Sequence, residues 1–292
     1  MKLTADSKVL LQGFNEPHSS IHAARMRTYG TNIVAAVTPG LGGQTIDDIP
    51  VFDLVEQALP LVGSIDTTII WIPPYQVLDA ALEAIAAGIR QLIILSAGVP
   101  PLDMVHLLRI AEVTETLVVG PNSLGIIVPG KVLLGTQKSE FYTPGTVGIV
   151  SSSSTITYEV ALELTNSGLG QSISVSIGSD AIVGSSFVEW LKIFDKDETT
   201  QAIVLIGEPG GGSEEEAGYI ASTINKPAVA YIVGRHVPVE NFGHASVAAV
   251  IAGRGAIQQT AQSKIAAFKA VNVPIAERPS EIPELLKQVL NR

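Results

Sequence analysis

Cysteine is absent from this 292-residue chain. Its absence excludes disulfides, thiolate metal ligands and a cysteine nucleophile. No apolar run reaches the roughly 18 residues that a membrane-spanning helix needs, because Pro73, Pro74, Asp79 and Glu83 interrupt the longest candidate. The first residues also lack the apolar stretch of a secretory signal peptide. The sequence therefore predicts a cytoplasmic protein without a membrane anchor.

Positive charge is scarce as well. The chain has 18 Lys and Arg against 28 Asp and Glu, a formal net charge of −10, and no cluster of basic residues. Phosphate backbones and anionic lipids would repel such a chain, so neither nucleic acid nor a membrane is expected as a partner. Hydrophobic residues, by contrast, make up 46% of the sequence, which is enough for the cores of one large or two ordinary domains.

Short apolar runs alternate with helical patterns along most of the chain. Such alternation is typical of right-handed βαβ units, which build parallel sheets. Helical patterns are clearest at residues 77–89 and 102–113. The expected strands cover residues 8–13, 32–37, 67–72, 91–96, 116–120, 146–150, 172–177, 202–207 and 228–233.

The stretch from Pro129 to Pro144 interrupts this alternation with glycine, proline and polar residues. We therefore predict an α/β protein with a first domain at residues 1–130, a linker at 131–144 and a second doubly wound domain at 145–292.

Polar residues follow several expected strands of the second domain. Residues 151–159 open with four serines, Glu208 follows an apolar strand, and His244 stands between a glycine and a small apolar segment. Each has an ordinary explanation: the serines as a solvated helix cap, Glu208 as a surface carboxylate and His244 as a structural histidine. The loops at the carboxyl ends of parallel strands meet, however, so these groups are expected to converge.

Their convergence would suit phosphoryl transfer. Glu208 would accept a hydrogen bond from one imidazole nitrogen of His244 and leave the other nucleophilic. The helix that opens at the serines would hold the phosphoryl group at its amino end. These residues predict a phosphohistidine. The chain has neither a G-x-x-x-x-G-K-[ST] loop nor a G-x-G-x-x-G after its first strand, so the phosphoryl donor is expected on another chain.

Several distinctive segments occur along the chain: "QGF" (12–14), "VTPGLGG" (37–43), "PVF" (50–52), "GPN" (120–122), "GTVGIVSSSSTITYE" (145–159), "AIVLIGEPGGGSEEE" (202–216) and "FGHAS" (242–246). Together these segments extend along essentially the whole chain and resemble the α subunit family of succinyl-CoA synthetase (succinate–CoA ligase). The resemblance implies a Rossmann-like CoA-binding domain followed by a flavodoxin-like ligase domain. It also implies an ADP- or GDP-forming ligase that interconverts succinate, CoA and nucleoside triphosphate with succinyl-CoA, nucleoside diphosphate and phosphate.

Residue roles can be carried over from this resemblance by position. His244 is then the phosphorylated residue, Glu208 its carboxylate partner, and the backbone around Ser151 and Ser153 the phosphate-binding helix end. Tyr158 falls where the family has a tyrosine near the substrate. The resemblance also implies a β subunit, in an αβ or α2β2 assembly, that carries ATP or GTP with Mg²⁺. No metal site is expected on the present chain.

The family's CoA pocket is altered in this sequence. The corresponding positions are Asn15, Glu16, Pro17, His18, Pro39, Leu41, Leu95, Ser96 and Ala97. Here "NEPHSS" (15–20) replaces a glycine-rich turn, while Leu41 and Ala97 stand where the family has a lysine and a glutamate. Pro17 has no N–H to donate, and Glu16 adds a negative charge that repels an anionic ligand. CoA is therefore expected to bind more weakly than in other members.

Two classes of function stay open on the sequence. The first is a working ligase for succinate or a related carboxylic acid. The second is a non-catalytic or regulatory CoA-ligase-like protein that has lost normal CoA binding. The joint presence of His244, Glu208 and Tyr158 favours the working ligase.

Overall fold

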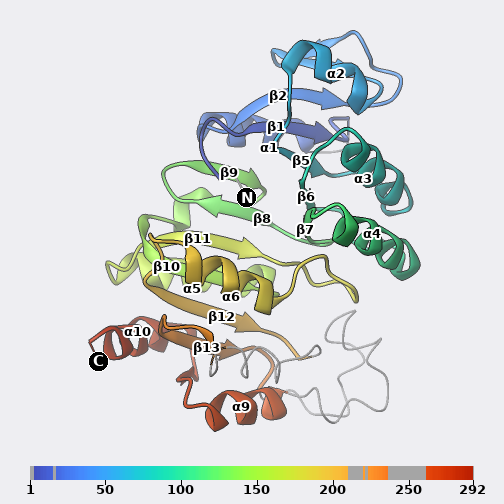
Figure 1. Ribbon diagram of the computed structural model, residues 1–292. Helices are drawn as coiled ribbons and strands as arrows, with labels where there is room; N and C mark the ends of the chain where they lie inside the picture. Colours follow the sequence, from blue (N-terminus) through green and yellow to red (C-terminus); the bar gives the residue numbers. More distant parts are fainter. Residues whose placement is uncertain (1–2, 16–17, 210–219, 221–222, 236–260, 292) are drawn as a thin grey trace. The chain divides into compact units, whose positions relative to one another are not determined.

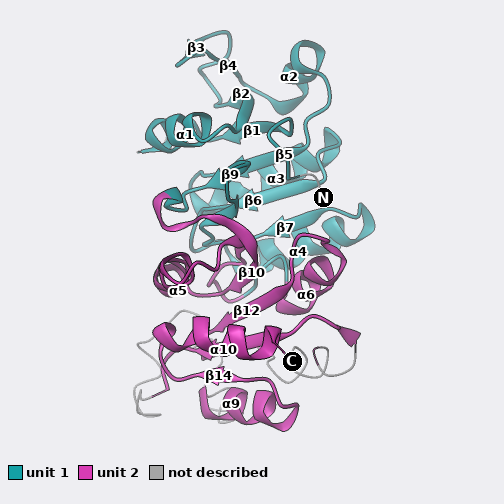
Figure 2. Cartoon of the chain, turned by 90° about the vertical axis from the view of Figure 1, so that its left-hand side faces the viewer, with its two compact units in different colours: residues 1–139, 182–185 teal, residues 140–181, 186–292 magenta. Residues whose placement is uncertain are grey.

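The computed structural model describes residues 3–15, 18–209, 220, 223–235 and 261–291. The chain divides into two compact units, one formed by residues 1–139 with 182–185 and the other by residues 140–181 with 186–292 (Figure 2). In each unit, helices cover a mostly parallel sheet (Figure 1). None of the helices in the described ranges has the length and apolar character that crossing a membrane requires.

The first unit contains a seven-stranded sheet in the order β3-β4-β2-β1-β5-β6-β7. Its strands are β1 (Lys8–Gln12), β2 (Asn32–Val37), β3 (Thr45–Ile46), β4 (Ile49–Phe52), β5 (Thr67–Ile70), β6 (Gln91–Ile94) and β7 (Leu117–Val119). Its helices are α1 (Ser19–Thr28), α2 (Val55–Val62), α3 (Val77–Ala86) and α4 (Pro101–Val113), with a 3₁₀ turn at Pro74–Gln76. An antiparallel hairpin of β8 (Gly125–Val128) and β9 (Val132–Gly135) follows.

The strand order identifies the first sheet as Rossmann-like. Apart from the short antiparallel β3, the strands lie in the chain order third, second, first, fourth, fifth and sixth. This is the order of dinucleotide-binding Rossmann sheets, so the expected fold of the first domain is confirmed.

The second unit has a parallel sheet in which β14, β13, β12, β10 and β11 are neighbours in that order. The strands are β10 (Pro144–Ser151), β11 (Gln171–Ser176), β12 (Ala202–Gly207), β13 (Ala228–Ile232) and β14 (Ile275–Ala276). The helices are α5 (Ser154–Asn166), α6 (Phe187–Lys196), α9 (Ala261–Ala270) and α10 (Ile282–Leu290), with 3₁₀ turns at Ser139–Phe141 and Pro279–Glu281. Numbered along the chain from β10 and read from β11, these strands lie in the order second, first, third, fourth and fifth. This is the flavodoxin order, as expected.

The central strands are buried because both faces of each sheet are covered. Every residue of β5, β6 and β12 is buried, as in parallel sheets with helices on both sides. In the second unit, α5 connects β10 to β11 in one direction across the sheet, and α6 connects β11 to β12 in the opposite direction. Right-handed crossovers therefore place these two helices on opposite faces (Figure 2).

All the strands expected from the sequence are present, and several others are added. The additional strands are β3, β4, β8, β9 and β14, which span two to four residues each. Runs of this length are too short to show a clear period. The region 131–144, expected as a linker, contains β9, and the division between the two units falls after Ser139.

Gly13 allows the loop after β1 to pass close to the end of β5. Its φ is 98°, and an added Cβ would lie 2.0 Å from the carbonyl oxygen of Trp71. Gly13→Ala is therefore expected to lower the free energy of unfolding by about 3 kcal/mol or more, measured by urea denaturation. Gly88 is a matched control because its φ is 90° but nothing lies within 4 Å of its Cβ position. Gly88→Ala should cost only about 1–2 kcal/mol, and equal losses would contradict a role for the close contact.

Candidate active site

Each sheet has a topological switch point, where the connections that follow two adjacent strands lead to opposite sides of the sheet. In the first unit this point lies between β1 and β5, and in the second between β10 and β12. Ligands of open α/β sheets bind outside the carboxyl ends of the strands at such points. In the second unit, Ser151 ends β10 and Glu208 directly follows β12. The sheet topology therefore brings these two predicted site residues to the same edge.

The serines after β10 form a turn that is fixed by its own hydrogen bonds. The Ser151 hydroxyl donates to the carbonyl oxygen of Ser153 at 2.9 Å and accepts from the backbone N–H of Ser153 at 3.0 Å. Thr157 donates its hydroxyl to Ser151 Oγ at 2.7 Å. Ser151 and Ser153 are both buried. The Ser151 side chain therefore shapes the turn, and its hydrogen-bonding groups are used there.

At the amino end of α5, the first backbone N–H groups are not capped by the Ser153 side chain. Ser153 is the N-cap residue, yet its side chain makes no capping hydrogen bond. Its hydroxyl acts instead on the Glu208 carboxyl, whose pKa it lowers. The first backbone N–H groups of a helix have no partner inside the helix, and they carry the positive end of its dipole. The first turn of α5, Ser154–Ile156, can therefore bind an anion.

Glu208 lies partly buried beside this helix end. Burial raises the pKa of the Glu208 carboxyl, while the Ser153 hydrogen bond and the positive charge of Lys264 oppose that rise. Both groups therefore favour the ionised form of the carboxyl, whereas burial disfavours it. Among the described residues, no group of three His, Asp or Glu could hold a metal ion.

A cavity of about 210 Å³ lies at the corresponding point of the first unit. It is lined by Gly13, Asn15, Thr38, Pro39, Ile72, Pro73 and Gln76. Ser96 lies behind it, where its hydroxyl donates to the Ile72 carbonyl oxygen at 2.6 Å and accepts from the Ile72 N–H at 3.0 Å. Ser96 thus holds one wall of the cavity in place.

In the glycine-containing loop after β2, an acidic side chain accepts hydrogen bonds from two backbone N–H groups. The backbone N–H groups of Gly40 and Gly42 both donate to Asp53 Oδ1, at 2.7 and 3.1 Å. The N–H of Leu41 donates to the Thr38 carbonyl oxygen at 3.1 Å. The donors of this loop are therefore engaged within the protein, and Leu41 provides no charge in their place.

Sequence comparisons match both halves of the chain to known domain families. The CoA binding domain matches residues 4–98, and the CoA-ligase domain matches residues 150–284. Succinate–CoA ligase [ADP-forming] subunit alpha 2 of Archaeoglobus fulgidus is 41% identical over 97% of each chain. The alpha subunit of the same enzyme from Aquifex aeolicus is 38% identical over 98% of this chain and 93% of the relative. The chain belongs to the succinate–CoA ligase α-subunit family.

A solved structure supports the fold of this family member. ATP citrate lyase from Methanothrix soehngenii, in complex with citrate and coenzyme A, aligns with a TM-score of 0.84 and 21% identity. The alignment covers all of this chain and 50% of that one. At this identity the likeness concerns the fold, and it covers both units.

The described residues place only part of the predicted site of this family member. Tyr158 lies half-buried on α5, with its ring 5.7 Å from that of Phe141 in an edge-to-face contact. His244, Glu16 and Pro17 lie outside the described residues.

The remaining positions of the predicted CoA pocket differ in exposure. Asn15 and Pro39 line the cavity, His18 and Ala97 are exposed, and Leu41 is partly buried. Leu95 is also partly buried and lines a second, apolar cavity of about 20 Å³.

Lys264 was not predicted from the sequence. It is buried on α9, on the same face as Ala261 and Phe268. The signal that could have revealed it is a lysine placed at helical spacing among apolar residues. Lysine is almost never fully buried without a partner, so this placement indicates a specific role.

Proposed function

We propose that this chain is the α subunit of a succinate–CoA ligase. With a β subunit, it would convert succinate, CoA and nucleoside triphosphate reversibly into succinyl-CoA, nucleoside diphosphate and phosphate. The observation that carries the proposal is the position of Glu208 beside the uncapped amino end of α5. The full-length similarity to α subunits of this enzyme supports it.

The residues of the second unit would act on a phosphoryl group carried by His244. A nitrogen of the His244 imidazole forms the bond to phosphorus as the bond to the leaving nucleoside diphosphate or acyl oxygen breaks. Glu208 would accept a hydrogen bond from the other ring nitrogen and stabilise the positive charge that develops on the ring. The first-turn N–H groups of α5 would bind the phosphoryl oxygens. Tyr158 would lie near the carboxylic acid substrate.

CoA would bind to the first unit at the carboxyl ends of β1 and β5. The cavity there is lined by residues of the segments that follow β1, β2 and β5, the place where ligands of such sheets bind. The predicted contacts around Asn15, Pro39 and Ser96 lie at or behind this cavity. Leu41 and the engaged N–H groups of Gly40 and Gly42 offer little to an anion, which supports weak CoA binding.

The nucleotide and Mg²⁺ would be supplied by the β subunit. The chain has no phosphate-binding loop of its own in the sequence. The proposed assembly is either αβ or α2β2, and the proposed nucleotide is either ATP or GTP. The proposed location is the cytoplasm.

A coupled assay with a β-type partner tests the function. Nucleotide consumption should require succinate, CoA and Mg²⁺ together, and a panel of related carboxylic acids should identify the preferred acid. A correctly assembled complex that consumes no nucleotide with any acid would overturn the proposal in favour of a non-catalytic partner.

Leu41 offers a direct test of the CoA site. Leu41→Lys is expected to tighten CoA binding about tenfold, because a charge-assisted hydrogen bond to phosphate contributes ~1.5–3 kcal/mol. Isothermal titration calorimetry measures the change in Kd. Leu61→Lys is the matched control, since Leu61 is 69% exposed on α2 and does not line the cavity. Equal tightening in both variants would indicate a general charge effect and contradict a specific contact at Leu41.

A further inference from the structure

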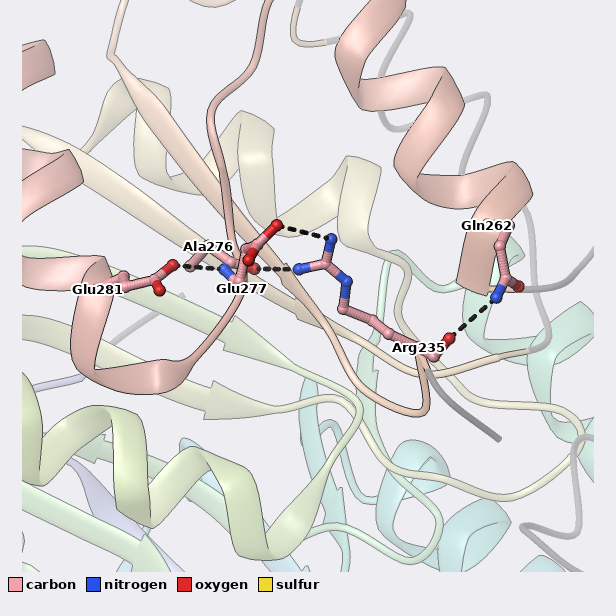
Figure 3. A network of polar contacts seen from close by, with 5 residues as sticks. All are labelled: Arg235, Gln262, Ala276, Glu277 and Glu281. Carbon is pink, nitrogen blue, oxygen red and sulfur yellow. Dashed lines mark hydrogen bonds and ion pairs between the residues drawn. The ribbon is translucent and has the colours of Figure 1, made fainter. Parts of the chain in front are cut away.

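Two backbone N–H groups of the loop after β2 bind the carboxylate of Asp53. Its Oδ1 accepts from the Gly40 N–H at 2.7 Å and from the Gly42 N–H at 3.1 Å. Within the described part of the chain, Asp53 forms no ion pair. Glu277 of the second unit differs, because its carboxylate lies 3.7 Å from the guanidinium of Arg235 (Figure 3). Asp53 therefore places an unpaired negative charge on the donors of the glycine loop.

These donors form a concave site of the kind that binds anions. The two N–H groups converge on one oxygen atom. The loop can turn in this way because Gly40 and Gly43 have φ values of 87° and 84°, a region that glycine adopts readily. Backbone N–H groups that converge in such turns bind phosphate as well as carboxylate. The donors that Asp53 occupies are therefore chemically suited to a phosphate group.

The donor site lies next to the cavity of the first unit. Pro39 lines the cavity of about 210 Å³, and Gly40 follows Pro39 directly in the chain. Gly40 and Gly42 are both exposed. Ligands of open α/β sheets bind at this edge, outside the carboxyl ends of the strands. A ligand that carries phosphate groups would therefore meet the charge of Asp53 at the glycine donors.

Other contacts hold the two ends of the loop in place. The Thr38 N–H donates to the carbonyl oxygen of Phe52 at 2.9 Å, and the Gly43 N–H donates to that of Val51 at 3.0 Å. Phe52 and Val51 belong to β4, so both ends of the loop are attached to the sheet. Removal of the Asp53 carboxylate is therefore expected to free the two donors without releasing the loop.

We propose that Asp53 is an internal competitor that occupies phosphate-binding donors of the loop after β2 and thereby lowers the affinity for CoA. This inference rests on the proposed function, in which CoA binds at this cavity. A phosphate group reaches the donors only when the carboxylate leaves them, or it meets the repulsion between two like charges. The phosphate could belong to the diphosphate or to the 3′-phosphate of CoA, and both present the same oxygen acceptors.

Calorimetric titration of CoA into the full chain tests the inference. Asp53→Ala removes the charge and frees both N–H groups, so the Kd should fall by about tenfold. Asp53→Asn removes the charge but keeps an oxygen acceptor, so its Kd should lie between those of Asp53→Ala and the wild type. Asp48→Asn is the matched control, because Asp48 is an exposed acid in the turn between β3 and β4. Its Kd should equal that of the wild type.

Two results of this titration would overturn the inference. Unchanged or weaker binding by folded Asp53→Ala would mean that the carboxylate orders the loop instead of competing for its donors. Equal tightening in Asp48→Asn would assign the gain to net charge. If Asp53→Ala does not fold, Asp53→Asn decides by the same criteria. With 3′-dephospho-CoA, a retained gain would support the inference for the diphosphate, and a lost gain would support it for the 3′-phosphate.

Inorganic pyrophosphate separates this inference from the proposed function. In the ¹⁵N-labelled chain, the amide signals of Gly40 and Gly42 should shift saturably with pyrophosphate in Asp53→Ala, and much less in the wild type. If these signals shift while none of the proteins binds CoA, the proposed CoA site fails and the competition by Asp53 stands. If they do not shift in Asp53→Ala, the inference is overturned whatever the affinity for CoA.

Discussion

His244→Asn is expected to abolish phosphorylation of the chain by Mg²⁺ and ATP in the presence of its β-type partner. Asparagine is close to histidine in polarity but has no ring nitrogen that can act as a nucleophile, so the loss should exceed about a thousandfold. The measurement is incorporation of radioactive phosphate into the chain. In the wild type, this label should be labile in acid and stable in base, as expected of a phosphohistidine.

Two controls accompany this experiment. His106→Asn changes an exposed histidine on α4, in the first unit, and should leave the label unaffected. The purified chain without its partner should not be labelled, because the sequence contains no phosphate-binding loop for ATP. Persistent label in His244→Asn would contradict the assignment of the phosphorylated residue, and stoichiometric labelling of the chain alone would contradict the need for a partner.

The fold and the family were predictable because their signals extend over many residues. The buried strand β12 is a continuous apolar run, and β5 and β6 end in apolar residues. The alternation of such strands with helices specifies parallel sheets. The confirmed strand orders depend on this alternation together with the resemblance to a known family. The short strands β3 and β14, of two residues each, carry no such signal. They form because the neighbouring β4 and β13 present free edges to pair with.

The roles of individual polar residues were harder to predict. The sequence indicated a phosphate-binding helix end near Ser151, but not that the Ser151 hydroxyl is used inside the turn. It indicated the loss of a lysine at Leu41, but not that Asp53 engages the neighbouring glycine N–H groups. Asp53 engages N–H groups that lie 11 and 13 residues away in the chain, and a local pattern of residue types does not encode such pairing. The burial of Lys264 was not predicted either.

Glu208→Gln tests whether the negative charge of Glu208 contributes to phosphorylation of the complex. Glutamine preserves the size of the side chain and can accept a hydrogen bond, but it carries no negative charge for the developing imidazolium of His244. Phosphorylation of the complex is therefore expected to slow by about a hundredfold. Glu198→Gln, at an exposed acid of the second unit, is the matched control and should leave the rate unchanged. A wild-type rate in Glu208→Gln would exclude Glu208 from the reaction.

The same substitution should also alter how stability depends on pH. Burial raises the pKa of Glu208 in the folded state above its ordinary value of 4.5. The folded state therefore binds this proton more tightly than the unfolded state does. The resulting stabilisation is complete below pH 4.5 and is lost as the pH rises through the higher folded value. Glu208→Gln removes this titration, so its free energy of unfolding should increase relative to wild type across that window.

The size and direction of this change can be measured by urea denaturation of both proteins at a series of pH values. The difference in unfolding free energy should change by at most about 1.4 kcal/mol per pH unit, the limit for a single proton. It should level off once the folded carboxyl is ionised. Lys264 reduces the effect, because its charge lowers the pKa of Glu208, and Lys264→Met should extend the window to higher pH. A difference that is constant with pH would mean that Glu208 titrates alike in the folded and unfolded states, and the buried, electrostatically supported carboxylate proposed for the reaction would then be wrong.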